Sequence, residues 1–188
     1  METRTDLTAF AAKIGEVRKR IADVVVGQTE AVDMLLTCII ADGHVLIEGV
    51  PGVAKTLLAR LMSRLIDARF SRIQFTPDLM PSDVLGTSVF NMKTQEFSFH
   101  PGPAFADIIL ADEINRAPAK TQAALFEVME ERQATIDGTS YKMGDVYTII
   151  ATQNPIEQEG TYRLPEAQLD RFLMKITMGY PSLDDEVE

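Results

Sequence analysis

The segment formed by residues 49–56 constrains this chain more than any other, because it places a glycine-rich turn between an apolar run and an amphipathic pattern. The apolar run covers residues 44–48. Residues 57–68 carry apolar side chains at helical spacing: Leu57, Leu58, Leu61, Leu65 and Ile66. A strand, a glycine-rich turn, Lys-Thr and a helix together form the context of a phosphate-binding loop, in which backbone N–H groups converge on one point. We predict that Lys55 contacts the β- and γ-phosphates of a nucleotide and that the Thr56 hydroxyl binds Mg²⁺.

Ala54 departs from the usual pattern of this loop, which has glycine before the lysine. Alanine adds a methyl group where the backbone passes closest to the nucleotide, and it disfavours a positive φ. On this motif alone, a surface loop with an ordinary lysine is an alternative, and other segments must decide between the two.

Length and composition indicate one globular domain with a sizeable core, since the chain has 188 residues of which 46% are hydrophobic. No apolar run reaches the length of a membrane span, and the first residues lack the basic and apolar pattern of a leader, so we expect a cytoplasmic protein. The single cysteine, Cys38, lies in an apolar segment and excludes a disulfide framework. The net charge of −10 weighs against non-specific binding to DNA or anionic lipid, although a local basic groove is compatible with it.

The order of elements predicts an α/β fold built on a doubly wound parallel sheet of five strands. Strands are expected near residues 45, 71, 108, 147 and 174. Helices are expected over residues 7–21, 30–41, 57–68, 118–131 and 165–171. We expect Asp6 to cap the first helix, Gly43 to occupy the C′ position of the second, and Pro118 to begin the fourth. Residues 24–28 read as a short extended piece.

Two β-hairpins interrupt this pattern. Residues 88–90 and 96–99 alternate around a polar turn, and a short helical turn precedes them at residues 79–86. A second hairpin surrounds Asp137-Gly138, with flanking strands at 134–136 and 141–143. We interpret the segments 76–103 and 133–144 as insertions into the α/β frame. From the residues alone, decorative surface hairpins are an equal alternative.

Two carboxylates follow the apolar run of residues 108–111, which is typical of a strand buried on both faces. Ligands of parallel sheets collect at the carboxyl ends of the strands, where Asp112 and Glu113 are expected to lie. Asp112 would hold the hydration shell of Mg²⁺, while Glu113 would orient the attacking water or accept its proton. Asn154, at the end of the next strand, would contact the same water or the γ-phosphate. Each of these residues alone also has an ordinary structural explanation.

Taken together, the motifs resemble the AAA+ ATPases and, within them, the MoxR branch. The residues that carry the resemblance are 49–56, 111–117, 151–155 and 164–172, which form the two Walker motifs, the first sensor and a Leu-Pro-Glu-Ala-Gln-Leu-Asp-Arg-Phe run. The resemblance extends from about residue 24 to residue 181. MoxR-like sequences often carry alanine before the loop lysine. By this resemblance, Ala54 is a trait of the branch and not a defect of the loop.

The resemblance implies a site for ATP and Mg²⁺. It would be built from Val26, Gly27, Gly49, Val50, Pro51, Gly52, Val53, Ala54, Lys55, Thr56 and Leu57, with Val26 and Gly27 near the adenine. The metal ligands would be Thr56 and Asp112. The catalytic residues would be Glu113, Asn154 and Arg171. Asn154 would be the first sensor, and Arg171 would be an arginine finger that acts on ATP held by a neighbouring subunit. A homo-oligomer is therefore implied, typically a hexameric ring. Arg116 and Arg163 are weaker candidates for this interface, with a surface salt bridge as their alternative.

The resemblance further implies a chaperone-like ATPase that remodels or matures client protein complexes, with von Willebrand factor A domain proteins as partners. Both hairpins would then face the centre of the ring or these partners. A nucleic-acid motor is the first alternative, which the acidic charge disfavours; a nucleotide-regulated interaction module is the second. The family continues into a small helical lid, which we expect to be missing from this chain. All 188 residues would then form the α/β nucleotide-binding core, with residues 1–23 as its N-terminal helix.

Overall fold

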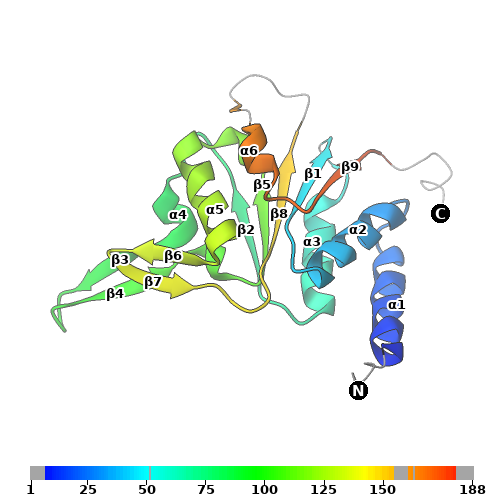
Figure 1. The fold of residues 1–188 in the computed structure, drawn as a ribbon, viewed down its shortest axis with the longest axis horizontal. Coiled ribbons are helices and arrows are strands. Elements are labelled where there is room, and N and C mark those ends of the chain that lie inside the picture. Colours follow the sequence, from blue (N-terminus) through cyan, green and yellow to red (C-terminus); the bar gives the residue numbers. More distant parts are fainter. Residues whose placement is uncertain (1–6, 51, 155–160, 163, 181–188) are drawn as a thin grey trace, which may run out of the picture.

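The computed structural model describes residues 7–50, 52–154, 161–162 and 164–180. Its centre is a five-stranded sheet in the order β2-β5-β8-β1-β9, in which every pairing is parallel (Figure 1). The strands are β1 (Val45–Gly49), β2 (Phe70–Gln74), β5 (Ile108–Asp112), β8 (Thr148–Gln153) and β9 (Met174–Met178). Helices cover both faces, so the predicted doubly wound parallel sheet is confirmed.

The helices divide between the two faces of the sheet. On one face lie α1 (Thr8–Ala22), α2 (Thr29–Ile40) and α3 (Lys55–Leu65). The other face is covered by α4 (Pro81–Leu85) and α5 (Ala119–Glu131), while α6 (Glu166–Leu169) precedes β9. Two short 3₁₀ helices, Pro103–Phe105 and Ile114–Arg116, flank β5. No helix in these described segments is long and apolar enough to cross a membrane.

The central strands feed both hydrophobic cores, because successive side chains of a strand point to opposite faces. In β1, Val45 and Ile47 pack with the first three helices, whereas Leu46 packs with α5. β5 alternates in the same way, with Ile108 on the first face and Ile109 on the second. Each of these fully buried aliphatic side chains contributes roughly 1.5–3 kcal/mol, which explains why β1 and β5 read as apolar runs.

Both predicted hairpins form, and they lie side by side away from the main sheet (Figure 1). The first pairs β3 (Gly86–Asn91) with β4 (Glu96–Pro101), and the second pairs β6 (Gln133–Ile136) with β7 (Thr139–Lys142). The rings of Phe99 and Tyr141 stack between the hairpins, with 4.0 Å between centroids. This contact makes the two insertions one projecting unit.

The junction between α1 and α2 differs from the prediction. Residues 24–26 form a turn, not an extended piece, because the N–H groups of Val24 and Val25 both donate to the carbonyl of Ile21 at the end of α1. Val25 is buried beneath this turn, while Val26 is exposed. The β-branched run therefore seals a helix end instead of pairing in a sheet.

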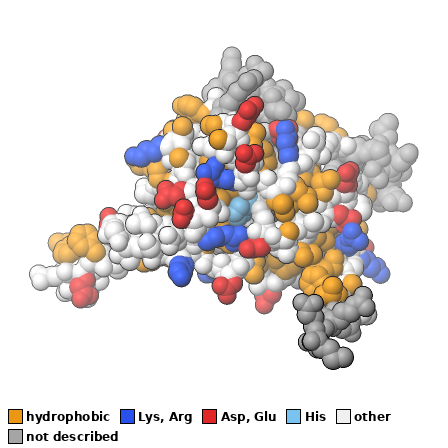
Figure 2. All heavy atoms as spheres, viewed as in Figure 1, with side chains coloured by type: hydrophobic (Ala, Val, Ile, Leu, Met, Phe, Trp, Pro, Cys, Tyr) orange, Lys and Arg blue, Asp and Glu red, His pale blue; other side chains and the backbone are white. Residues whose placement is uncertain are grey.

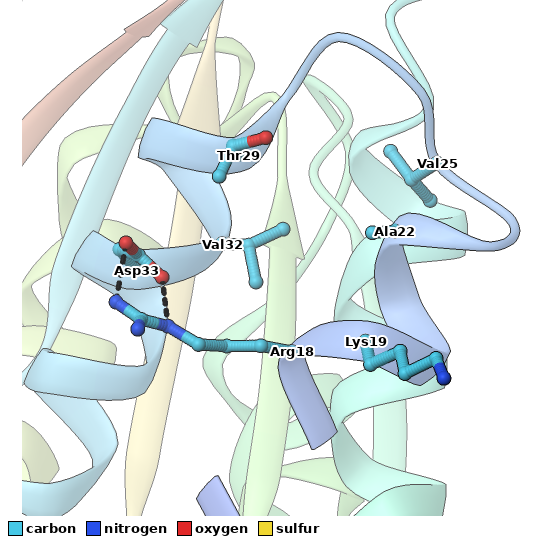
Figure 3. A pocket seen from close by; sticks show the side chains of 7 residues that line it. All are labelled: Arg18, Lys19, Ala22, Val25, Thr29, Val32 and Asp33. Atoms are coloured by element: carbon cyan, nitrogen blue, oxygen red, sulfur yellow. Dashed lines mark hydrogen bonds and ion pairs between the residues drawn. The ribbon is translucent and has the colours of Figure 1, made fainter. Parts of the chain in front are cut away.

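Figure 3 shows the groove below that turn, where Arg18 of α1 reaches across to Asp33 of α2 and the two charged groups lie 2.5 Å apart. Both side chains are exposed to solvent, so this ion pair contributes little to stability. Ala22, Val25 and Val32 form the apolar part of the groove, whose volume is about 260 Å³. Apolar packing against α2 and α3 is thus the main attachment of α1.

Several predicted helix ends shift. Asp42, with φ of 53°, takes the left-handed position after α2 that was expected for Gly43, and Gly43 donates its N–H to the Cys38 carbonyl one position later. Pro118 caps α5 instead of starting it, and the helix expected over residues 165–171 has only four residues. The proposed cap Asp6 lies outside the described residues.

Candidate nucleotide site

A cavity of about 420 Å³ opens at the carboxyl ends of β1, β5 and β8. Its lining consists of Gly52, Val53, Ala54, Lys55, Thr56, Leu57, Asp112, Glu113 and Asn154. All nine are residues predicted from the sequence to bind the nucleotide, to bind the metal or to take part in catalysis. The structure therefore brings the loop, the two carboxylates and the buried Asn154 into one site, at the edge where parallel sheets bind ligands.

The loop has a backbone that favours glycine at two positions. A side chain at Gly49 would place its Cβ 2.6 Å from the carbonyl oxygen of Met178 on β9, and Gly52 has φ of 89°. Ala54 adopts a left-handed conformation as well, with φ of 58° and ψ of 20°. An alanine there is strained by about 1–2 kcal/mol. The loop thus keeps the positive φ even with alanine at this position.

Lys55 lies at the first position of α3, so the unpaired N–H groups of the first helical turn lie at the cavity as well. Its Nζ donates to the carbonyl of Gly49 at 2.8 Å. Burial lowers the pKa of Lys55, whereas the carboxylates of Asp112 and Glu113 act in the opposite direction. The ammonium group thus shares one electrostatic environment with both acids.

Leu57 belongs both to the apolar helical pattern and to the predicted nucleotide site; its side chain is 43% exposed and lines the cavity. The helix buries Leu58, Ala59, Met62 and Ser63 instead. Because the loop fixes where the first turn of α3 starts, Leu57 points toward the ligand side rather than toward the sheet.

The carboxylate of Asp112 is held from two neighbouring strands. Thr152 on β8 donates its hydroxyl hydrogen to Oδ1 at 2.6 Å, and Arg72 on β2 donates from Nη2 to Oδ2 at 2.6 Å. One oxygen is therefore fixed from each side. The same Arg72 nitrogen also donates to the side-chain carbonyl of Gln74 at 2.7 Å.

Glu113 follows in a left-handed backbone conformation, with φ of 55°. Its N–H donates to Thr152 Oγ1 at 2.9 Å, and its Oε2 accepts a hydrogen bond of 2.8 Å from Gln74. Arg116 lies 3.3 Å from the same oxygen. The carboxylate is thus oriented by polar groups on β2 and on the 3₁₀ helix that follows.

Oxygen donors suited to Mg²⁺ are present at this cavity, since Thr56 and Asp112 both line it. Among the described residues, no group of three or more His, Cys, Asp or Glu side chains could hold a metal ion alone. Mg²⁺ typically takes one or two protein oxygens and completes its shell with water and substrate phosphates. The donor set therefore fits a metal that binds together with a nucleotide.

One of the two residues predicted to lie near the adenine is at a second cavity of about 450 Å³, between the start of α2 and β9. Gly27 lines it, whereas Val26 does not and is 40% exposed. Gln28 closes one side by donating to the Gly179 carbonyl at 3.1 Å. Of the remaining loop residues, Val50 packs partly against the core and Pro51 lies outside the described residues.

Arg171 does not line the cavity of about 420 Å³ that holds the loop and the two carboxylates. Its Nη2 lies 2.5 Å from Oε2 of Glu130, and its Nη1 donates to the Ala167 carbonyl at 2.9 Å. Of the weaker interface candidates, Arg116 contacts Glu113 of its own chain, and Arg163 lies outside the described residues.

Three residues of the site were not assigned a role from the sequence: Arg72, Gln74 and Thr152. Thr152 stood within a recognised motif, but its partners lie on another strand and only the register brings them together. Arg72 and Gln74 alternate along β2 with the buried Ile73, which is an ordinary pattern for a strand that is open on one face.

Comparison with known proteins decides the family. The sequence profile of the ATPase family associated with various cellular activities (AAA) matches residues 44–174, which hold the loop, both carboxylates and Asn154. The chain belongs to this AAA family. Its AAA domain is 53% identical over 175 residues to the uncharacterized protein YeaC of Bacillus subtilis and 51% identical over 182 residues to the chaperone MoxR1 of Mycobacterium tuberculosis. The predicted MoxR-type relationship is confirmed.

A crystal structure of a protein from Cytophaga hutchinsonii, assigned as an ATPase, shares the AAA fold with a TM-score of 0.79 and 47% identity. The alignment covers 97% of this chain and 57% of that one. The alignments with YeaC and MoxR1 likewise include 93% and 95% of this chain. They include only 55% of YeaC and 48% of MoxR1. It therefore corresponds to about half of these relatives.

Proposed function

We propose that this AAA domain binds and hydrolyses ATP with Mg²⁺, and that hydrolysis drives the chaperone-like remodelling or maturation of protein complexes. One observation carries the proposal: the loop of residues 52–57, Asp112, Glu113 and Asn154 line a single cavity. Phosphoryl transfer needs positioning and charge neutralisation more than covalent help from the protein, and this cavity supplies groups for both.

Each group has a distinct part in this proposal. The N–H groups of the loop and Lys55 bind the phosphates, and Thr56 with Asp112 hold Mg²⁺, which neutralises phosphate charge when bound. Glu113 orients the attacking water and accepts its proton, and Asn154 holds that water or the γ-phosphate. In the present structure Gln74 and Arg116 both contact Oε2 of Glu113, and these contacts orient the carboxylate.

Assembly into a homo-oligomeric ring, with six subunits as the expected number, is part of the proposal. Arg171 does not line the proposed nucleotide cavity of its own chain, which is compatible with a role at the ATP of a neighbouring subunit. Such a residue contributes roughly 10³–10⁵ in rate in related phosphoryl-transfer systems. ATP binding should then be a property of single chains, and hydrolysis a property of the oligomer.

The projecting hairpins support action on other proteins. Figure 2 shows hydrophobic side chains gathered near the end of the β3–β4 hairpin, where Val89, Phe90, Met92 and Phe97 are exposed. Exposed apolar clusters of this kind mark contact sites for proteins. Partners with von Willebrand factor A domains, and a cytoplasmic location, are part of the same proposal and rest on the sequence.

The test compares the 188-residue chain with its Glu113→Gln variant under conditions that allow assembly. We expect the variant to bind ATP within about threefold of the parent, because the loop and Lys55 are unchanged, while phosphate release falls by roughly 10²–10⁴ after loss of the base. Hydrolysis at the parental rate would show that Glu113 is not the base. Salt-dependent binding of the parent to DNA would instead favour the nucleic-acid motor.

A further inference from the structure

Thr152 occupies the junction between the two proposed functional carboxylates. It lies near the end of β8, directly beside β5, and its side chain is fully buried. Its single hydroxyl oxygen lies 2.6 Å from Asp112 Oδ1 and 2.9 Å from the backbone nitrogen of Glu113. One side chain thus contacts both residues at the point where the strand ends.

The direction of both hydrogen bonds follows from the donors available. A hydroxyl has one hydrogen, and an ionised carboxylate can only accept, so the hydrogen points at Asp112. The N–H of Glu113 can only donate, so it must use a lone pair of the same oxygen. The resulting chain, N–H to hydroxyl to carboxylate, has one orientation, and a bond to a carboxylate is among the stronger kinds.

Both ends of this chain need to be held. Glu113 has a left-handed backbone conformation, which residues other than glycine rarely adopt. The hydrogen bond from its N–H to Thr152 stabilises that conformation. Asp112 is also bound by Arg72, whose guanidinium pulls its other oxygen toward β2. The two pulls together fix the plane of the carboxylate.

We propose that Thr152 is a positioning residue for the metal, which orients the Asp112 carboxylate toward Mg²⁺ and sets the backbone from which Glu113 projects. This inference rests on the proposed ATP site. Residues that orient a metal ligand typically contribute 10–100-fold to metal affinity or activity. The effect should therefore appear in the gain in ATP affinity that Mg²⁺ provides, rather than in ATP affinity without the metal.

The chain offers a matched control on the same strand. Thr148 is as deeply buried as Thr152, but within the described residues its hydroxyl has no hydrogen-bond partner. Replacing either threonine by valine preserves shape and removes one hydroxyl. Only at Thr152 does that hydroxyl connect to the site, so the pair separates positioning from packing.

The experiment measures the ATP dissociation constant of the full 188-residue chain by calorimetry, once with Mg²⁺ and once with EDTA. In Thr152→Val, we expect the factor by which Mg²⁺ tightens ATP binding to be about 10–100-fold smaller than in the parent. The affinity for ATP in EDTA should be unchanged. Thr152→Ser, which keeps the hydroxyl, should stay within about threefold of the parent, and Thr148→Val should match it. Thr152→Ala gives the same test without a methyl group against Asp112, should the valine variant not fold.

Other outcomes overturn the inference in distinguishable ways. Full retention of the Mg²⁺ gain in Thr152→Val or Thr152→Ala would show that the hydroxyl does not orient Asp112. An equal loss with and without metal would assign Thr152 to packing. A parent that binds ATP equally well in Mg²⁺ and EDTA would contradict the metal role of Asp112, whereas a parent that binds no ATP would overturn the proposed function itself.

Discussion

The guanidinium of Arg171 forms an ion pair with the carboxylate of Glu130 in its own chain, with 2.5 Å between Nη2 and Oε2. Glu130 lies near the end of α5 and Arg171 just after α6, so the pair ties these two helices together. A finger that acts on a neighbouring subunit must give up this partner or share it. The proposed assembly therefore has a defined contact to compete with.

Arg171→Ala should reduce ATP hydrolysis by roughly 10³–10⁵, while ATP affinity stays within about threefold. The physical reason is that the finger stabilises charge that develops only during transfer. Mixing this variant with Glu113→Gln should restore part of the hydrolysis, because one chain supplies an intact site and the other an intact finger. Absence of recovery in the mixed oligomer would contradict a role in trans.

The central sheet could be predicted from the sequence because each strand and the loop show their character in a few consecutive residues. Strand β5 is apolar on both faces, and the backbone of the loop before α3 favours glycine at positions 49 and 52. The lining of the cavity followed from these elements, since parallel strands end at one edge.

Other features depend on tertiary contacts that local patterns do not carry. The bond from Thr152 to Asp112 depends on the register between β8 and β5. At the end of α2, Asp42 and not Gly43 takes the left-handed position, and the Gly43 N–H donates to the Cys38 carbonyl. The exposure of Leu57 at the cavity depends on the position at which α3 begins after the loop.

Ala54→Gly should raise the free energy of unfolding by up to about 1 kcal/mol. The left-handed conformation of Ala54 costs roughly 1–2 kcal/mol, and the added flexibility of glycine in the unfolded chain offsets about half of that. Ala123→Gly is the matched control, because Ala123 is exposed within α5 and should lose about 1 kcal/mol. Urea unfolding measures both; equal destabilisation by the two variants would contradict strain at Ala54.

His44 should make stability depend on pH below neutrality. Its Nδ1 accepts from the N–H of Ile149 at 3.1 Å, so the proton is on Nε2, which faces the Met129 carbonyl at 3.2 Å. Burial lowers the pKa from 6.5 to about 4, with a smaller contribution from Arg132 in the same direction. As the pH falls from 6.5 to 4, the unfolded chain therefore takes up a proton that the folded chain excludes.

The folded state should lose about 3 kcal/mol across this window, relative to a variant without the histidine. Urea unfolding at pH 7 and pH 4.5 measures the difference. His44→Gln is expected to be less stable at pH 7 but to show the smaller loss on acidification, whereas replacing the exposed His100 by glutamine should leave the loss as in the parent. An unchanged loss in His44→Gln would assign the pH dependence to other groups.

The most direct test of the nucleotide site is equilibrium binding of ATP to the parent chain and to Lys55→Ala in the presence of Mg²⁺. Lys55 is the cation at the start of α3 within the cavity, so its removal should weaken binding by at least 10–100-fold while the fold persists. Circular dichroism and thermal unfolding confirm that the variant is folded. ATP binding of equal strength in both chains would contradict the assignment of this loop as the site at which the protein holds its nucleotide.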